Sequence, residues 1–127
     1  MKKLVLLFVV LLALVCSILP ITAFAGKKAL QTPEKGWAEP TVYFAARVRM
    51  RMSRYLSAAA ILERAIKTWP KSDRVDEATY WIAFSYERAS ANEQAVLWYK
   101  AFLQRYPDHQ WASQARRRLD TLEAQRM

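Results

Sequence analysis

Small and apolar side chains recur at intervals of three and four residues over the second half of the chain, which is the spacing of one buried face of an α-helix. In the first such stretch this face comprises Val75, Ala78, Thr79, Ile82, Tyr86 and Ala89. In the second, which begins at Asn92, it comprises Ala95, Val96, Tyr99, Phe102 and Leu103. Tyr106-Pro107 ends the second stretch, because the residue before proline is pushed out of the α region. We therefore expect a helical hairpin from Val75 to Pro107.

Similar patterns predict helices on both sides of this hairpin. Pro40 gives a helix start, since its missing N–H has no intrahelical partner in a first turn, and residues 42–53 continue without glycine or proline. A helix from about Leu56 to Thr68 follows, and it ends at Trp69-Pro70. Asp108 is expected to begin a last helix, whose apolar face comprises Ala112, Ala115, Leu119 and Leu122.

The chain also repeats itself at an interval of 37 residues, the separation of Pro70 and Pro107. Because one helical pair cannot bury its apolar face alone, such repeats stack. We predict an all-α fold, a short α-solenoid of antiparallel helix pairs with about two repeats and a C-terminal capping helix. The residues expected to define the repeat and its core are Ala58, Leu62, Ala65, Pro70, Ile82, Ala83, Tyr86, Ala95, Tyr99, Phe102, Pro107, Ala115 and Leu119.

The first 25 residues have the three parts of a secretory signal. Lys2 and Lys3 precede an apolar run over residues 4–19, and the small-residue site Ala23-Phe24-Ala25 precedes Gly26. We expect a signal peptide over residues 1–25, cleavage near Ala25 and Gly26, and export to the periplasm. The alternative is an uncleaved inner-membrane anchor, since the run almost reaches the roughly 20 apolar residues that a bilayer requires.

Residues 26–39 contain both glycines, Pro33 and three lysines, and they lack apolar periodicity. They are predicted to be a flexible linker, which leaves residues 40–127 for the repeat domain. Cys16 is the only cysteine, and Val15 stands where bacterial lipoprotein signals carry a small residue, so we expect no lipid anchor. An export signal without a disulfide framework favours a bacterial periplasm.

The formal charge is +9, and +7 remains once Lys2 and Lys3 are removed. A strongly basic chain suggests nucleic acid first, but export argues against that partner. Outside the cytoplasm a basic surface meets anionic lipid, peptidoglycan carboxylates or an acidic protein patch, or it serves only solubility.

Residues 75–109 resemble the tetratricopeptide repeat, a helix-turn-helix unit of about 34 residues. The similarity extends from Pro40 to about Leu122 and is greatest to bacterial envelope proteins, namely the periplasmic partner of the Tol-Pal system and the lipoprotein subunit of the outer-membrane protein assembly machine. The resemblance implies a scaffold that binds proteins, with the first helix of each pair lining a concave face. Three residues depart from the pattern: Arg49 replaces a tyrosine, Thr79 a tryptophan and Ser90 the turn glycine.

No catalytic constellation is visible in the sequence. His109 is the only histidine, and no cysteine lies near it to complete a metal site. Asp73, Asp76 and Glu77 crowd a helix start, where carboxylates compensate the helix dipole. We therefore expect no enzyme activity, no metal and no cofactor.

A binding surface is what remains. The residues expected on the open face of the first helices are Tyr43, Arg47, Met50, Arg51, Glu77, Tyr80, Phe84, Glu87, Arg88 and Arg117. Exposed aromatic and arginine side chains together are typical of binding hot spots. Tyr80 and Phe84 form the leading pair, although packing against the neighbouring first helix is an equal alternative.

The sequence thus predicts a protein-interaction adaptor of the bacterial envelope that binds a partner protein through a concave face. The alternative is a basic module associated with the membrane surface or with peptidoglycan. Nucleic acid is not an expected partner.

Overall fold

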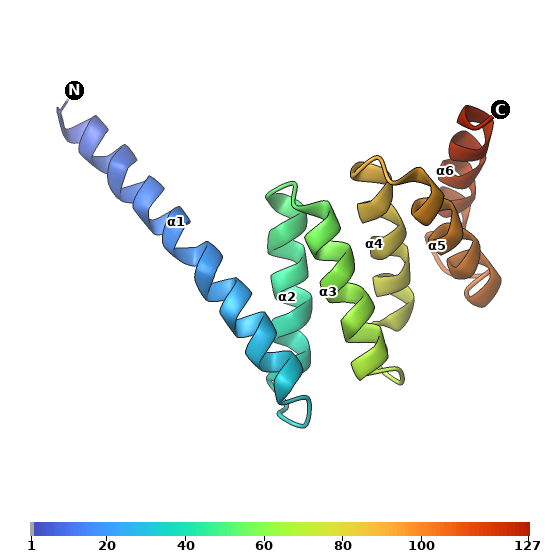
Figure 1. The fold of residues 1–127 in the computed structure, drawn as a ribbon, viewed down its shortest axis with the longest axis horizontal. Coiled ribbons are helices and arrows are strands. Elements are labelled where there is room, and N and C mark those ends of the chain that lie inside the picture. The colour runs from blue at the N-terminus through green and yellow to red at the C-terminus, as the bar shows by residue number, and fades with distance from the viewer. Residues whose placement is uncertain (1) are drawn as a thin grey trace.

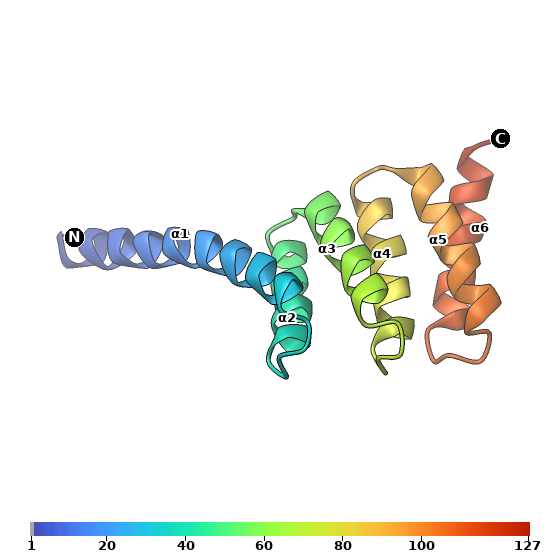
Figure 2. The same cartoon turned by 60° about the horizontal axis from the view of Figure 1, so that its bottom comes forward.

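The computed structural model describes residues 2–127, except for the side chains at positions 15, 18, 19, 22 and 23. Over this range the chain folds into six α-helices and no strand. They are α1 (Lys2–Gln31), α2 (Ala38–Arg51), α3 (Tyr55–Thr68), α4 (Val75–Arg88), α5 (Asn92–Arg105) and α6 (Ala112–Gln125). Each helix packs on the next, and α2 to α6 follow one another in a row (Figures 1 and 2). The predicted all-α, solenoid-like fold is confirmed.

The helix boundaries repeat at the interval found in the sequence. Helices α2, α4 and α6 have 14 residues each and begin 37 residues apart, and α3 and α5 show the same length and separation. The two turns between paired helices also match, because Ser53 and Ser90 have φ values of 57° and 60°. A left-handed residue at this point in a helix C-terminus is usually glycine. Serine therefore takes the glycine conformation in both repeats.

The core consists of two buried clusters that share Trp81, Tyr86 and Trp98 at their edges. The first lies mainly between α2, α3 and α4, and the second between α4, α5 and α6. Of the residues predicted to define the repeat, Pro70 and Pro107 are exposed in turns and Tyr86 is half-buried. The others are buried, and Tyr99, Phe102 and Ile82 are among the largest side chains that are wholly enclosed. The polypeptide therefore buries its apolar faces mainly between helices that are close to one another in the row, as a solenoid does.

Ala95 tests this packing, because it is fully buried on α5 where α4 and α5 meet. Replacing it by leucine is expected to force the two helices apart and to lower the free energy of unfolding by about 1 to 3 kcal/mol. Thermal melting of both forms measures the difference. The matched change Ala101→Leu, at an exposed position of the same helix, should leave the melting temperature close to that of the parent. Equal melting temperatures for Ala95→Leu and the parent would contradict the packing described.

The segment predicted to be a flexible linker, residues 26–39, is largely helical instead. Helix α1 continues to Gln31, and Ala29 is fully buried against the first cluster. A Cβ at Gly26 would lie 3.2 Å from Ile61 Cδ1 and 3.4 Å from Ala45 Cβ, so glycine permits the close approach of α1. The Trp69 indole N–H donates a hydrogen bond to the carbonyl oxygen of Pro33 at 3.2 Å. Within the predicted linker, only the turn between Gln31 and Ala38 is not helical.

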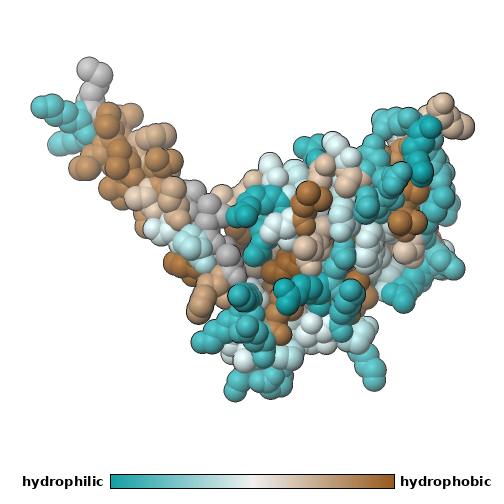
Figure 3. All heavy atoms as spheres, in the orientation of Figure 1, coloured by the Kyte–Doolittle hydropathy of each residue, from teal (hydrophilic) through white to brown (hydrophobic). Residues whose placement is uncertain are grey.

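The N-terminal part of α1 leads away from the array and carries apolar side chains that nothing covers (Figures 1 and 3). These exposed residues are Leu4, Val5, Leu6, Leu7, Phe8, Val9, Val10, Leu11, Leu12 and Leu14. A search of the described residues for an apolar helix of membrane-crossing length finds none.

Arg49 replaces the expected tyrosine and leaves a buried nitrogen without a partner. In the second repeat, Tyr86 donates a hydrogen bond from its hydroxyl to Glu63 Oε1 at 2.5 Å. At the matching place in the first repeat, Gly26 stands where Glu63 would be, and Arg49 Nη1 finds no hydrogen-bond partner among the described residues. Burial, and next the charge of Arg54, lower the pKa of Arg49. At this position the first repeat therefore lacks the hydrogen bond that the second repeat makes.

Candidate binding groove between α2 and α4

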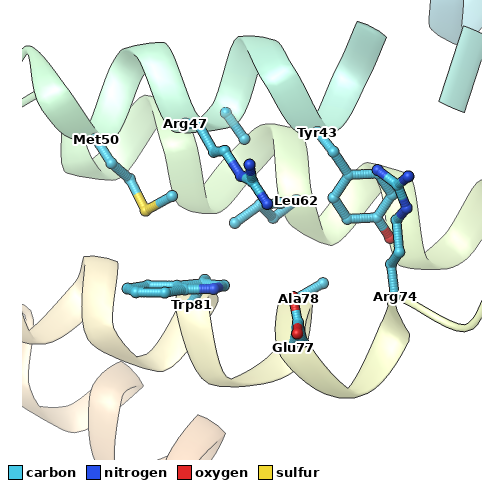
Figure 4. A pocket seen from close by; sticks show the side chains of 9 residues that line it. Tyr43, Arg47, Met50, Leu62, Arg74, Glu77, Ala78 and Trp81 are labelled. Atoms are coloured by element: carbon cyan, nitrogen blue, oxygen red, sulfur yellow. The ribbon is translucent and has the colours of Figure 1, made fainter. Parts of the chain in front are cut away.

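A groove separates α2 and α4, the first helices of neighbouring repeats. Its narrower part is a pocket of about 250 Å³ lined by Tyr43, Ala46, Arg47, Met50, Leu62, Arg74, Glu77, Ala78 and Trp81 (Figure 4). A wider hollow of about 570 Å³ shares four of these residues and is lined by Arg47, Met50, Arg51, Tyr55, Glu77, Trp81, Phe84 and Trp111. The pocket and the hollow together are called the groove below.

Helical spacing places the lining residues along facing helices. Tyr43, Arg47 and Met50 stand at intervals of four and three on α2, so they share one helix face. On α4 the spacing of Glu77, Trp81 and Phe84 is the same. In Figure 4 Met50 and Arg47 reach from α2 toward α4, and Trp81 lies across from Met50.

The groove has a small-residue floor and an aromatic wall. Ala46 and Ala78 are buried and too short to fill the space between the two helices. The Trp81 ring lies 5.5 Å from Phe84 and 5.4 Å from Trp111 between centroids, both in edge-to-face geometry. Such aromatic contacts stabilise each other beyond the area they bury. The wall is therefore held in place before any partner binds.

Arginine side chains give the groove its charge. Arg47, Arg51 and Arg74 are exposed, and Glu77 is the one carboxylate among the lining residues. Over residues 2–127 the ion pairs within 4 Å are Lys100 with Glu123 and Arg118 with Glu87, and His109 Nε2 lies 3.5 Å from Asp76, so no groove arginine contacts a carboxylate. The Arg74 guanidinium carbon lies 5.5 Å from the centre of the Tyr43 ring. Among the described residues, the groove arginines therefore have no carboxylate within 4 Å.

Tyr43 brings an unsatisfied polar atom to the same pocket. Its side chain is only 8% exposed, and its hydroxyl is buried without a hydrogen-bond partner among the described residues. The nearby Ser72 hydroxyl donates its own hydrogen bond to Glu39. Burial first, and then the charge of Glu39, raise the pKa of Tyr43 to about 12. The hydroxyl is therefore a neutral, available donor at neutral pH.

Six of the ten residues predicted for the open face line the groove: Tyr43, Arg47, Met50, Arg51, Glu77 and Phe84. For Tyr80 the prediction of an open position is wrong, because its side chain is 2% exposed. Its ring packs against Tyr99, Phe102 and Trp111 with centroid distances of 5.9, 5.6 and 4.9 Å. Tyr80 therefore lies on the side of α4 that packs against α5 and belongs to the core. Phe84 is half-buried and lines the groove.

The remaining three predicted residues lie outside the groove. Glu87 accepts hydrogen bonds from the Tyr99 hydroxyl at 2.6 Å and from Arg118 Nη1 at 2.8 Å. The Arg88 guanidinium lies 5.5 Å from the centre of the Tyr55 ring. Arg117 borders a separate shallow hollow with Gln114, Arg118, Thr121 and Glu87. The predicted face is thus divided between the groove and the outer side of the second repeat.

The groove residues that sequence reasoning missed include Trp81, Arg74 and Trp111. Trp81 could have been found, because it stands four residues after Glu77 and three before Phe84 on one helix face. Arg74 and Trp111 occupy the turns directly before α4 and α6. The helical spacing of apolar residues does not extend to turn residues, so these two required the structure.

His109 has a structural role in the turn between α5 and α6. Its Nδ1 accepts a hydrogen bond from the backbone N–H of Trp111 at 3.1 Å, and its Nε2 lies 3.5 Å from Asp76 Oδ2. The ring packs 5.2 Å from Phe102 and 5.1 Å from Trp111. Across the described residues, no group of three or more histidine, cysteine, aspartate or glutamate side chains is placed to hold a metal. His109 therefore fixes Trp111 at the end of the groove.

Comparison of the chain with protein-family models gives no match, and a search of curated proteins gives none either. The resemblance to tetratricopeptide repeats stays a prediction that rests on the residues named above.

Proposed function

We propose that this protein is an exported, non-enzymatic adaptor of the bacterial envelope, built from tetratricopeptide-like repeats, that binds a partner protein in the groove between α2 and α4. The observation that carries the proposal is the groove itself. It combines a preformed aromatic wall, exposed arginines and Met50. Aromatic and arginine side chains dominate the energetics of protein interfaces, and methionine adapts to varied partner surfaces.

The N-terminal residues support export. Lys2 and Lys3 precede a helix segment of exposed apolar side chains, and neither core cluster includes a described residue before Ala29. Removal of residues 1–25 would therefore take no described side chain out of either cluster. We propose that the chain acts in the periplasm after cleavage, with an uncleaved inner-membrane form as the alternative.

A specific observation also favours a second function, that of a basic module on anionic lipid or peptidoglycan. The net charge is +9, and arginines project from several helices as well as from the groove. This alternative requires charge but not the aromatic wall, so the two functions differ in which residues they need.

A double variant, Met50→Ala with Phe84→Ala, separates the two functions. Both side chains line the hollow without carrying charge, and the change is expected to reduce recovery of the partner from envelope extracts at least about tenfold. The matched control is Phe44→Ala with Leu97→Ala, two side chains that are 60% and 66% exposed on α2 and α5, outside the groove. Mass spectrometry of the recovered proteins, with circular dichroism of each variant, gives the result.

Equal recovery by the groove and control variants would contradict the groove as binding site. Retention on anionic vesicles at low salt, with release at about 0.15 M salt in all variants alike, would support the membrane-surface alternative instead, because exposed charges are screened over about 8 Å at that ionic strength.

A further inference from the structure

We propose that the occupant of the groove is an extended acidic peptide segment of the partner protein, with an apolar side chain next to a carboxylate. This inference rests on the proposed function and names the chemistry of the partner. It follows from three features of the groove: its unpaired arginines, the orphaned hydroxyl of Tyr43, and the size and shape of the pocket.

The charges around the pocket select for an anion. Arg47 and Arg74 line its two sides, and neither is engaged by a carboxylate within 4 Å in the part of the chain that the structure describes. Arg51 adds a third guanidinium at the wider end. Glu77 is the one carboxylate among the lining residues, and Glu39 and Asp73 lie near the Tyr43 hydroxyl, where Arg74 offsets their charge. Arginine binds carboxylates through charge-assisted, often bidentate hydrogen bonds. A carboxylate of the partner would therefore meet an arginine both in the pocket and at the wider end of the groove.

The Tyr43 hydroxyl is a hydrogen-bond donor that is buried without an acceptor among the described residues. A buried hydroxyl without a partner is destabilising, and an acceptor on a ligand would relieve this. The hydroxyl lies at the end of the pocket next to Arg74 (Figure 4). One carboxylate could accept from both groups, so the pocket distinguishes an acid from an amide by charge and from an alkyl group by hydrogen bonding.

Size and shape favour a peptide in extended form. The pocket of about 250 Å³ is several times the roughly 30 Å³ that a water molecule occupies, so it admits a whole side chain. The two 14-residue helices that border the groove are about 21 Å long, a length that six or seven extended residues span. Trp81, Met50 and Phe84 offer apolar surface beside the arginines. Alternate side chains of an extended segment could then meet the two kinds of surface.

Fluorescence anisotropy with the full-length protein and labelled peptides of about eight residues provides the test. One peptide alternates glutamate with leucine, and two matched peptides carry glutamine or lysine in place of glutamate. We expect the glutamate peptide to bind about tenfold or more tightly than the glutamine peptide, and to weaken between about 0.05 and about 0.3 M salt. The lysine peptide should not bind.

Variants locate the effect within the groove. Arg47→Gln, Arg74→Gln and Tyr43→Phe are each expected to weaken the glutamate peptide by about three- to tenfold. Arg64→Gln removes the same charge from an exposed position on α3 and should change nothing. An equal loss with Arg64→Gln would mean unspecific attraction and would overturn the inference.

Failure of this inference is distinguishable from failure of the proposed function. If the glutamine peptide binds as tightly as the glutamate peptide, and Met50→Ala with Phe84→Ala abolishes both, the groove is a binding site but its acidic preference is refuted. The acidic-segment inference is also refuted if neither peptide binds. It is refuted as well if anionic vesicles displace the glutamate peptide equally from the parent protein and from all variants. Recovery from envelope extracts then decides the proposed function independently.

Discussion

Replacing Phe102 by alanine is expected to lower the free energy of unfolding by about 3 to 5 kcal/mol. The ring is fully buried in the second cluster, with centroids 5.6 Å from Tyr80, 5.8 Å from Tyr106 and 5.2 Å from His109. Removal of the ring leaves a cavity, because the surrounding aromatic rings are held by their own contacts and can fill the space only in part. Because a domain of this size is stable by only about 5 to 15 kcal/mol, the loss would consume much of the total.

Urea denaturation followed by circular dichroism measures this loss. Leu97→Ala on the same helix is the control, because that side chain is exposed and should cost less than about 0.5 kcal/mol. A loss below about 1 kcal/mol for Phe102→Ala would show that α5 does not direct this face inward.

A second large effect is expected in alkali, because folding raises the pKa of several tyrosines. Burial is the leading cause for Tyr43 and Tyr86, whose pKa values rise from 10.0 to about 12, and it raises that of Tyr99 further with help from Glu87. Below pH 10 both the folded and the unfolded chain keep these protons, so the stability is fully present. Between pH 10 and 12 the unfolded chain loses them while the folded chain does not, and stability falls as pH rises.

Linkage sets the size of this fall at up to about 1.4 kcal/mol per pH unit for each tyrosine, or about 4 kcal/mol per unit for the three together. Tyrosinate absorbance and circular dichroism, recorded in one titration, should therefore change together in a cooperative transition. Tyr43→Phe removes one of these groups and should make the fall of stability with pH shallower. Tyrosinate absorbance that rises well before the helical signal is lost would contradict the burial of these hydroxyls.

Much of the fold could be predicted because its physical causes are periodic. The 37-residue interval and the apolar faces determine which side chains are enclosed, and the first helices begin at Ala38, Val75 and Ala112 at this interval. The part of α1 from Gly26 to Gln31 was not predicted to be helical. Its buried positions are Gly26 and Ala29, and a glycine in a sequence usually indicates a loop. Pro33 was the available signal, because it precedes Pro70 by the same 37 residues.

The groove could be predicted only in part because helical spacing gives the faces of one helix but not its neighbours. Phe84 and Tyr80 are four residues apart and share a side of α4, yet α5 and Trp111, in the turn before α6, cover Tyr80 and leave Phe84 at the edge. Tyr43 was predicted from its position, but the burial of its hydroxyl depends on the packing of α2 beside Arg74 in the turn before α4. Such details arise from packing between elements distant in sequence.

The most direct test of the groove as partner site is photocrosslinking in intact cells. A photoreactive phenylalanine derivative placed at Met50 would lie in the groove, and the same group placed at Leu97 would lie on exposed α5. We predict that position 50 crosslinks to one envelope protein, identified by mass spectrometry, and that position 97 does not. Crosslinking of the same protein from position 97, with none from position 50, would contradict the groove as the partner site.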